Sequence, residues 1–446
     1  MVKTANKNQR KFKIETKQKI TLTSQQREAL TAMLDFVASR EKLFLLTGYA
    51  GCGKTTLIQC LFRELQLNGD KRKVVFTAPT NKAVKVLKNM ANAWELDINC
   101  MTCFRLLGLK PKINKETGKE EFVRDYDVKA SIDRYEIVVV DETSMVNQEL
   151  WNLLFNEVQG LLNTTKLIFT GDKAQLPPVG EPESLVFSQI SQTADLTEVV
   201  RFEGAIGVLT ETIRNNLESP QLPLLKNEFN ASKTKGIFVL NSQVWLKNLL
   251  KAFESDKYQR NPDYCRVLAW TNKRVNFLNQ QIRQVIYGSE VPRFMEGERL
   301  MAMDTCLKNE EVLLASSAEC EILEARIEKL ENDWKIWSLL ILDEEAKTKK
   351  LQVIHEESLA KLNQVLAKQA EIKNWEGFWK IKKQFHNVNY TYALTVHKGQ
   401  GSTFENVFIS LGDILRNPKI KERNQLLYVA TSRAAERIFV EKNSGN

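Results

Sequence analysis

Residues 43–65 read LFLLTGYAGCGKTTLIQCLFREL, and this stretch decides the fold. Its apolar start predicts a buried strand over Leu43–Thr47. The glycine-rich segment Gly48–Thr55 follows directly, and the apolar spacing from Thr56 to Leu65 predicts a helix. A strand, a glycine-rich loop and a helix in this order are the context of a phosphate-binding loop.

The loop GYAGCGKT matches the pattern G-x-x-x-x-G-K-[ST]. Glycines allow backbone N–H groups to wrap phosphates at the start of a helix, where the helix dipole favours negative charge. Lys54 would neutralise the β- and γ-phosphates, and the Thr55 hydroxyl would hold Mg²⁺. We therefore expect a site for ATP and Mg²⁺ that is built from Gly48, Ala50, Gly51, Cys52, Gly53, Lys54, Thr55 and Thr56.

A pair of carboxylates follows a second apolar run, Ile137–Val140. A strand that ends beside the phosphate-binding loop is where a second magnesium contact belongs. We expect Asp141 to hold the metal, directly or through water, and Glu142 to act as the general base on the attacking water.

Further apolar runs, Val74–Ala78 and Leu167–Thr170, predict two more strands, and helical periodicity covers 24–40 and 82–90. Strands that alternate with helices predict an α/β fold with a parallel sheet. Within this region, two short segments flank the turn-like NKETGK, so 107–128 is predicted to be a projecting β-hairpin.

A second α/β region begins near Leu196. Its expected strands, Val267–Trp270 and Val407–Ser410, enclose a different block with strands over 320–330, 335–342 and 351–355 and a helix over 358–373. We interpret that block as a small β-rich domain. The expected division is an arm over 1–20, a first domain over 21–195, a second over 196–295 and 386–446, and an insertion over 296–385.

Composition restricts the class of protein. The net charge of +9 and pI of about 9.0 favour a polyanionic partner, although solubility alone also accounts for such a charge. The basic arm at 1–20 would touch phosphates without sequence preference. No apolar run predicts a transmembrane helix or a secretory signal, and seven scattered cysteines indicate a reducing cytoplasm. No membrane partner is expected.

Several other residues carry candidate chemistry. Gln175 follows a strand in GDKAQLPPV and could sense the γ-phosphate, while Arg201 and Arg433 could bring positive charge to it if the chain folds back. The lone C-x-x-C at 100–103 has no second pair, which argues against zinc. Five aromatic residues could stack on bases, but the core of the insertion is the favoured location: Trp334, Trp337, Trp375, Phe378 and Trp379.

An ordered series of motifs supports a resemblance to a known family. They are LTSQQ (22–26), GYAGCGKT (48–55), FTAPTNKA (76–83), VVVDETSM (138–145), GDKAQLPPV (171–179), LTEVVRF (196–202), LAWTNK (268–273), TVHKGQGSTFENVF (395–408) and LLYVATSR (426–433). The chain resembles the superfamily 1 helicases of group B, the RecD-like enzymes, and within them the small phage Dda-type DNA helicases. The resemblance covers about residues 20–440. It implies two RecA-like motor domains, a pin hairpin inserted in the first and an SH3-like domain inserted in the second.

The resemblance also assigns roles. It implies that Gln26 contacts adenine, that Gln175 couples the γ-phosphate to movement, and that Arg201 and Arg433 are arginine fingers from the second domain. The hairpin would be the strand-separating pin, with Phe122 as its wedge. The residues expected to touch single-stranded DNA are Thr80, Thr102, Thr271, Asn272 and His397.

The sequence departs from the pattern in the insertion. Its second strand pair, DWKIWSLLILDEEAKTKKLQVIHE, has no turn glycine, and Ser316-Ser317-Ala318 stands where relatives often have Asn-Gly.

The expected function is therefore an ATP-dependent DNA helicase that moves 5′→3′ and opens duplexes. Expected partners are single-stranded and fork DNA, with a single-stranded DNA-binding protein as a further candidate. The resemblance also implies a working monomer in the cytoplasm of a bacterial or phage-infected cell, at the nucleoid. Two alternatives stay open: an RNA helicase or non-unwinding translocase, and an ATP-gated binding module.

Overall fold

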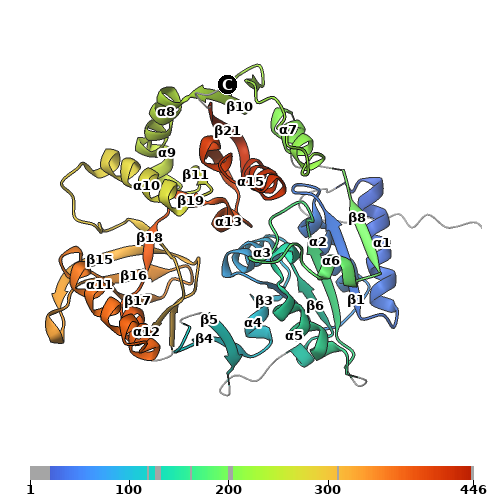
Figure 1. Cartoon of the computed structure of the whole chain (residues 1–446). Coiled ribbons are helices and arrows are strands. Elements are labelled where there is room, and N and C mark those ends of the chain that lie inside the picture. Colours follow the sequence, from blue (N-terminus) through green and yellow to red (C-terminus); the bar gives the residue numbers. More distant parts are fainter. Residues whose placement is uncertain are drawn as a thin grey trace, which may run out of the picture.

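The computed structural model describes residues 21–117, 120–125, 132–160, 163–198, 204–308 and 311–442 (Figure 1). The basic arm at 1–20 and the expected arginine finger Arg201 lie outside the described residues. Three bodies are visible in Figure 1: a sheet with its helices at lower right, a second sheet at the top, and a β-rich body at lower left.

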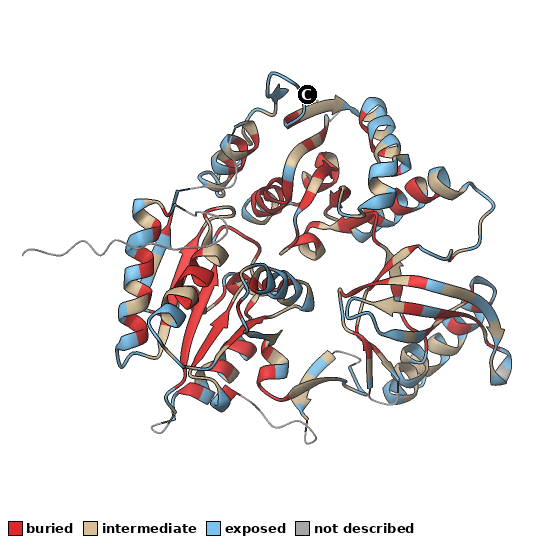
Figure 2. Cartoon of the chain, turned by 180° about the vertical axis from the view of Figure 1, so that it is seen from behind, coloured by how far each residue is buried: buried red, intermediate tan, exposed pale blue. Residues whose placement is uncertain are grey.

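The first body is a parallel six-stranded sheet with the order β3-β2-β6-β7-β1-β8. The strands are β1 Leu43–Gly48, β2 Val74–Ala78, β3 Asn99–Thr102, β6 Ile137–Val140, β7 Lys166–Gly171 and β8 Thr193–Leu196. Its helices are α1 Ser24–Ala38, α2 Lys54–Leu67, α3 Asn81–Ala93, α4 Cys103–Leu106, α5 Gln148–Val158 and α6 Val186–Gln189. All residues of β6 and β7 are buried, because helices cover both faces of the sheet (Figure 2).

The second body is another six-stranded sheet, with the order β19-β11-β20-β21-β10-β9. Only the short β9 pairs antiparallel among the described strands of this sheet. The strands are β9 Glu228–Phe229, β10 Gly236–Asn241, β11 Cys265–Ala269, β19 Ala393–Thr395, β20 Phe404–Ile409 and β21 Ala434–Lys442. The helices are α7 Ala205–Arg214, α8 Ser242–Glu254, α9 Asp256–Arg260, α10 Asn272–Tyr287, α13 Val396–Gly399, α14 Leu411–Ile414 and α15 Ile420–Ser432. The predicted α/β class with parallel sheets is confirmed.

The third body lies in sequence between β11 and β19. It contains a five-stranded sheet, β17-β16-β15-β12-β18, the hairpin β13-β14, and two helices. The elements are β12 Arg299–Ala302, β13 Cys306–Lys308, β14 Glu311–Leu314, β15 Glu319–Lys329, β16 Lys335–Asp343, β17 Thr348–Ile354, α11 Glu356–Glu371, α12 Trp375–Lys383 and β18 Val388–Tyr390. Because β18 pairs with β12, the sheet of the insertion continues past residue 385.

The strand pair without a turn glycine forms by other means. Between β16 and β17, Ala346 adopts a left-handed φ of 59°, and the Asp343 carboxylate accepts from the N–H groups of Glu345 and Lys347. Ser317, which lies before β15, is likewise left-handed, with φ of 63°. Side-chain capping thus replaces the glycines that the pattern normally supplies.

The predicted hairpin is present as β4 Leu109–Ile113 and β5 Glu120–Arg124, which pair antiparallel. Asn114 Oδ1 accepts from the N–H groups of Glu116 and Thr117, both at 2.9 Å, which sets the turn. Figure 1 shows the hairpin between the first body and the insertion, beside α12. The structure therefore brings the hairpin tip beside α12, although 263 positions separate Glu116 from Trp379 in the sequence.

Candidate active site and nucleic-acid interface

The loop between β1 and α2 has the geometry that phosphate binding requires. Gly51 and Gly53 adopt left-handed φ values of 83° and 84°, and no side chain caps the N-terminus of α2. Its first amide N–H groups are therefore available for an anion. Gly48 is required for space, since a Cβ there would lie 2.6 Å from Cys52 Sγ and 2.8 Å from Leu196 Cβ.

The loop lines a cleft of about 260 Å³ between the first and second bodies. Its wall contains Ala50, Gly51, Gly53, Lys54, Thr55, Thr56, Asp141, Glu142, Gly171, Asp172, Gln175, Gly401, Ser402, Thr403, Ser432 and Arg433, together with three side chains of α3. Lys54 Nζ donates to the carbonyls of Gly48 and Tyr49 at 2.6 and 3.0 Å. The structure thus collects residues from six of the sequence motifs at one cleft, since Ala83 of α3 belongs to FTAPTNKA.

Two of the predicted nucleotide residues, Gln26 and Cys52, are buried and support the loop. The side chain of Gln26 is buried, and its Nε2 donates to Cys52 O at 2.9 Å. Its Oε1 accepts from Thr23 N, which completes a capping box at the start of α1. Cys52 is buried too, and this burial raises the pKa of its thiol, so it is a neutral filler rather than a reactive thiolate.

The two carboxylates at the end of β6 differ in electrostatic setting from ordinary surface acids. Burial, and then the neighbouring charge of Asp141, raise the pKa of Glu142 to about 7, while Arg433 and Lys54 act in the opposite direction. Burial also raises the pKa of Asp141. A carboxylate with a raised pKa is a better proton acceptor, which suits Glu142 to general base chemistry.

Asp141 and the Thr55 hydroxyl, which line the same cleft, fit a magnesium ion. Mg²⁺ prefers oxygen ligands and is usually held by one or two protein groups plus waters and substrate phosphates. Within the described residues, no group of three or more His, Cys, Asp or Glu side chains could hold a metal by itself. An ion held by Asp141 and Thr55 would take its remaining ligands from water and from the nucleotide phosphates.

Gln175 stands at the junction of the two bodies. Its Oε1 accepts from Gln400 Nε2 at 3.0 Å, and its backbone carbonyl accepts from Gln425 Nε2 at 2.9 Å. Gln400 Nε2 also contacts Ser144 Oγ at 3.0 Å. Because Gln400 and Gln425 belong to the second body, Gln175 joins both bodies at the wall of the cleft.

Arg433 ends α15 and is buried against the cleft. Its Nη1 donates to Ser402 O at 3.3 Å, and its Nη2 donates to Ser432 Oγ at 2.8 Å. The structure thus brings Arg433 to Lys54 and Glu142, which no local feature of its sequence could predict. The other expected finger, Arg201, lies outside the described residues.

Thr80 and Thr102, expected to touch nucleic acid, sit at adjacent strand ends of the first sheet. Thr80 follows β2 and caps α3 by accepting from Ala83 N, and Thr102 ends β3 and caps α4 by accepting from Arg105 N. Since β2 pairs with the edge strand β3, the two helix starts follow neighbouring strands. Both threonines are half-buried.

The corresponding residues of the second sheet follow β11 and β19, which are also adjacent. Thr271 caps α10, but its hydroxyl also donates to Asp413 Oδ1 at 2.9 Å, so Asp413 fixes this turn. Asn272 is exposed beside it. His397 lies in α13, is half-buried, and has a pKa that burial lowers, which favours the neutral imidazole.

Phe122 is packed more closely than a free wedge would be. Its ring stacks on that of Phe104 from α4, with centroids 3.5 Å apart and planes 10° apart. At the turn of the hairpin, Trp379 Nε1 of α12 donates to Glu116 O at 3.1 Å, and Lys115 Nζ lies 3.2 Å from Glu376 Oε1. The insertion therefore holds the hairpin tip directly.

The five candidate aromatic residues divide into two groups. Trp334 and Trp337 are buried in the insertion, as predicted. The expectation is wrong for Trp375, Phe378 and Trp379, because none of the described residues of α12 is buried and Trp375 is 44% exposed. A nine-residue helix on the edge of a body shows its aromatic face to solvent and to the hairpin.

Some residues of the site went unnoticed in the sequence although they lie within the quoted motifs. The Tyr428 hydroxyl donates to Asp172 Oδ2 and accepts from Ala50 N. The Arg214 guanidinium lies 3.4 Å from the ring centroid of Tyr49. Asp172, Gln400 and Tyr428 lie inside quoted motifs, and this position could have marked them as site residues. Arg214 and Asp413 lie outside the motifs, so the sequence contained no indication of their roles.

None of the helices that the structure describes has the length and apolarity to cross a membrane. Cys100 and Cys103 are free thiols.

Comparison with known proteins places these features in context. Residues 21–228 match a family model described as an AAA domain, and residues 390–440 match the UvrD-like helicase C-terminal domain. The ATP-dependent DNA helicase dda of Enterobacteria phage T4 is 25% identical, over 94% of this chain and 98% of that protein. The RecBCD enzyme subunit RecD of Buchnera aphidicola is 24% identical, over 89% of this chain and 70% of its own.

An uncharacterized protein of Acanthamoeba polyphaga mimivirus is 28% identical, over 92% of this chain and 98% of that protein. Among solved structures, the Pif1 helicase from Bacteroides in complex with ADP-AlF3 and ssDNA aligns with a TM-score of 0.53 and 16% identity. That alignment covers 95% of this chain and 93% of the other, and at this identity it supports the fold alone.

Proposed function

Because this chain belongs to the superfamily 1 helicases of the RecD-like group, which use ATP, we propose that it moves 5′→3′ along single-stranded DNA and opens the duplex ahead. The observation that carries the proposal is the cleft itself. It combines a phosphate-binding loop, Asp141 and Glu142 from one body with Gln175 at the junction and Arg433 from the other. A site divided between two bodies links hydrolysis to their relative movement.

In the proposed reaction, the amides of the loop and Lys54 bind the phosphates, and Thr55 and Asp141 would hold Mg²⁺. The ion would neutralise charge on the β- and γ-phosphates. Glu142 takes the proton of the attacking water, and Arg433 stabilises the charge that develops on the γ-phosphoryl group. Arg201 is proposed as a second finger, and Gln26 as the adenine contact. An arginine so placed contributes about 10³–10⁵ in rate.

The proposed track for DNA runs across the helix starts at Thr80 and Thr102 on the first sheet, and at Thr271, Asn272 and His397 on the second. Helix N-termini and hydroxyl donors suit backbone phosphates. Because each motor domain carries its own pair of helix starts, closing and opening of the cleft would shorten and lengthen the track by one step. The division into two motor domains with an SH3-like insertion belongs to this proposal.

The hairpin β4-β5 is proposed as the pin that parts the strands. Its support comes from the contacts of Trp379 and Glu376 with the tip. The stack of Phe122 on Phe104 favours a role in stiffening the base of the pin, and a wedge role would require the ring to be exposed at the fork. Substitution of Phe122 tests the wedge role, and substitution of Phe104 tests the stacking contact beneath it.

Partners are proposed as single-stranded and forked DNA, with a single-stranded DNA-binding protein as a further candidate. We also propose a working monomer, at the nucleoid of a bacterial or phage-infected cell.

The decisive experiment is ATP-dependent unwinding of two duplexes, one with a 5′ and one with a 3′ single-stranded tail. Opening of only the 5′-tailed duplex is expected. Opening of only the 3′-tailed duplex would reverse the polarity, and opening of neither with DNA-stimulated ATPase intact would indicate a translocase. Competition between DNA and RNA oligomers for that ATPase separates a DNA motor from an RNA motor, and an ATPase insensitive to both would favour a binding module.

A further inference from the structure

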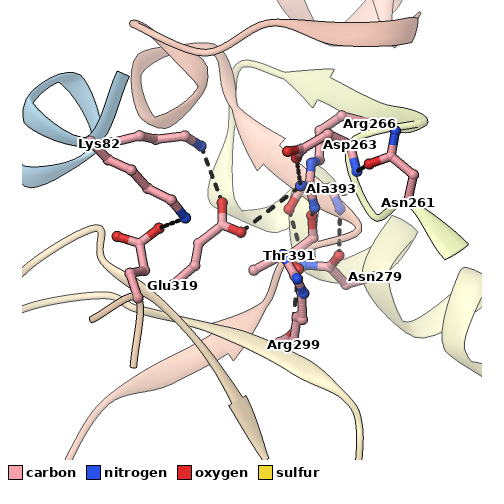
Figure 3. Close-up of polar contacts among 11 residues, drawn as sticks. Lys82, Asn261, Asp263, Arg266, Asn279, Arg299, Glu319, Thr391 and Ala393 are labelled. Atoms are coloured by element: carbon pink, nitrogen blue, oxygen red, sulfur yellow. Dashed lines mark hydrogen bonds and ion pairs between the residues drawn. The ribbon is translucent and has the colours of Figure 1, made fainter. Parts of the chain in front are cut away.

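One buried carboxylate joins all three bodies of the molecule. Glu319 begins β15 of the insertion and is 8% exposed. Its Oε1 lies 3.1 Å from Lys82 Nζ on α3 of the first body, and its Oε2 lies 4.0 Å from Arg266 Nη2 on β11 of the second (Figure 3). None of the three lines the nucleotide cleft.

The charge on Glu319 persists because two cations share it. Burial by itself would raise its pKa, but Arg266 and then Lys82 bring that pKa down to about 2. Removing one partner of such a buried set leaves an uncompensated charge, which is strongly unfavourable. The ion set therefore has a strong preference for the arrangement in which all three bodies are in contact.

The two ion pairs of Glu319 connect the insertion to different bodies. Arg266 is wholly buried, and its guanidinium donates to Thr391 O and, at 3.2 Å, to Asp263 Oδ1, which fixes it beside β11. The pair Glu319–Arg266 thus links the insertion to the sheet that carries it. The pair Lys82–Glu319 instead crosses to the first body, so relative movement of the two bodies acts on it.

A second contact connects this set to the nucleotide cleft. The Phe404 ring lies 5.6 Å from Lys82 Nζ and 4.9 Å from the Arg266 guanidinium. The Phe404 N–H donates to Arg433 O at 2.8 Å. Residues 402 and 403, immediately before Phe404, line the cleft. A shift of Arg433 toward a γ-phosphate therefore acts on the ring against which both cations rest.

We propose that Glu319 is a positioning residue that passes nucleotide-dependent movement at Arg433 to the insertion. This inference rests on the proposed function, because the insertion holds the hairpin tip through α12. In this arrangement Lys82 moves with the first body, and Arg266 stays fixed beside β11. Glu319 responds to the movement of Lys82 and shifts the start of β15. Closure of the motor and the position of the hairpin then change together.

The chain supplies a matched control on the same helix. Lys85 Nζ lies 3.0 Å from Glu344 Oε1, so it also joins α3 to the insertion. The Lys85 side chain is 48% exposed, against 17% for Lys82. An exposed ion pair contributes little to stability and is screened by salt. Loss of Lys85 therefore removes a cross-body ion pair without disturbing the buried set.

The experiment compares the full chain with Glu319→Gln, Lys82→Met and Lys85→Met. On each protein, ATP hydrolysis stimulated by single-stranded DNA and base pairs opened per ATP on a 5′-tailed fork are measured together. We expect base pairs per ATP to fall by at least about fivefold in Glu319→Gln and Lys82→Met, with kcat and KM for ATP nearly unchanged. Lys85→Met should match the parent.

Hydrogen exchange supplies a readout that needs no unwinding. In the parent, an ADP–aluminium fluoride complex should alter exchange in α12 and β15, and this response should be lost in Glu319→Gln and Lys82→Met. If Glu319→Gln does not fold, Lys82→Met decides, since it leaves Glu319–Arg266 intact.

Each other result counts against the inference. The inference is overturned if ATPase and unwinding fall in equal proportion in Glu319→Gln and Lys82→Met, or if neither quantity changes in them. It is also overturned if Lys85→Met shows the same loss of base pairs per ATP. Absence of the exchange response in the parent would overturn it as well. A parent that opens no fork but shows the exchange response, lost in the variants, would refute the proposed function and leave the inference standing.

Discussion

The hydroxyl of Tyr428 connects the two bodies at the phosphate-binding loop, since it donates to Asp172 Oδ2 at 2.6 Å. The same oxygen accepts from Ala50 N at 3.0 Å. Tyr428 belongs to α15 of the second body, whereas Asp172 and Ala50 belong to the first. A buried side chain from one body thus engages an amide of the loop that would surround the phosphates.

Replacing Tyr428 by Phe should lower the DNA-stimulated kcat, because it removes both hydrogen bonds and leaves Asp172 Oδ2 without the Tyr428 donor, while Oδ1 still accepts from Ala174 N. Loss of a partner from a buried polar group costs about 1–3 kcal/mol. Steady-state ATPase kinetics give the measurement, and Tyr264→Phe on the same body serves as control. An unchanged kcat would mean that the link is merely packing.

Replacing Gly48 by Ala should abolish tight ATP binding, because the added Cβ would meet Cys52 Sγ at 2.6 Å and Leu196 Cβ at 2.8 Å. Overpacking of this kind costs about 1–3 kcal/mol and here would distort the loop. Binding of a fluorescent ATP analogue measures the effect. Gly160→Ala is the control, since its nearest atom would be 3.8 Å away. Parent-like affinity in Gly48→Ala would contradict the geometry.

Replacing Glu142 by Gln should reduce ATP hydrolysis by about 10²–10⁴-fold while ATP binding is retained, because the amide cannot accept a proton. Equilibrium binding of the analogue and single-turnover hydrolysis separate the two quantities. Glu149→Gln, in the first turn of α5, removes a nearby acid outside the cleft and should behave as the parent does. Hydrolysis at the parental rate would exclude Glu142 as the base.

Replacing Trp379 by Phe should weaken unwinding by about two- to tenfold without altering DNA-stimulated ATPase, because it removes one donor to the hairpin tip and keeps an aromatic ring. Fork opening under single-turnover conditions is the assay. Trp375→Phe makes the same change on the same helix, at a residue that is 44% exposed and whose ring contacts Phe378. If Trp379→Phe opens forks as fast as Trp375→Phe and the parent, the hairpin needs no support from this hydrogen bond of α12.

His386 makes the insertion sensitive to acid. Burial lowers its pKa, Nδ1 accepts from Gln352 N at 2.9 Å, and Nε2 contacts Leu307 O at 3.1 Å. Because the folded pKa lies below the unfolded value of about 6.5, the unfolded chain takes up the proton first as pH falls. Stability should therefore decrease below that pH, by at most about 1.4 kcal/mol per pH unit.

Thermal melting between about pH 7 and pH 5 tests this, with His386→Gln as comparison. Glutamine offers one donor and one acceptor but does not titrate, so its melting temperature should change less with pH. Equal slopes in the two proteins would show that His386 is not the group responsible.

Local pattern was enough to predict the elements around the cleft. The runs Ile137–Val140 and Val74–Ala78 form β6 and β2 with the predicted bounds, because strands covered on both faces are mostly apolar. The loop Gly48–Thr55 could also be predicted from the sequence, because a positive φ and a close approach of the backbone to phosphate favour glycine.

Contacts between distant segments were beyond the sequence. Composition and residue spacing describe only neighbouring positions in the chain. They identified Arg433 and Gln175 as candidates but did not show that both line one cleft. The family resemblance implied roles for these residues but gave no distances between them. The exposed face of α12 and its contact with Glu116 depend on where the insertion lies relative to the hairpin. The meeting of Lys82, Arg266 and Glu319 depends likewise on three bodies, and a buried ion set is stable only when the tertiary structure brings its members together. The sequence by itself thus determined the strands, the phosphate loop and the chemical groups, and the tertiary structure alone decided which of those groups act on one another.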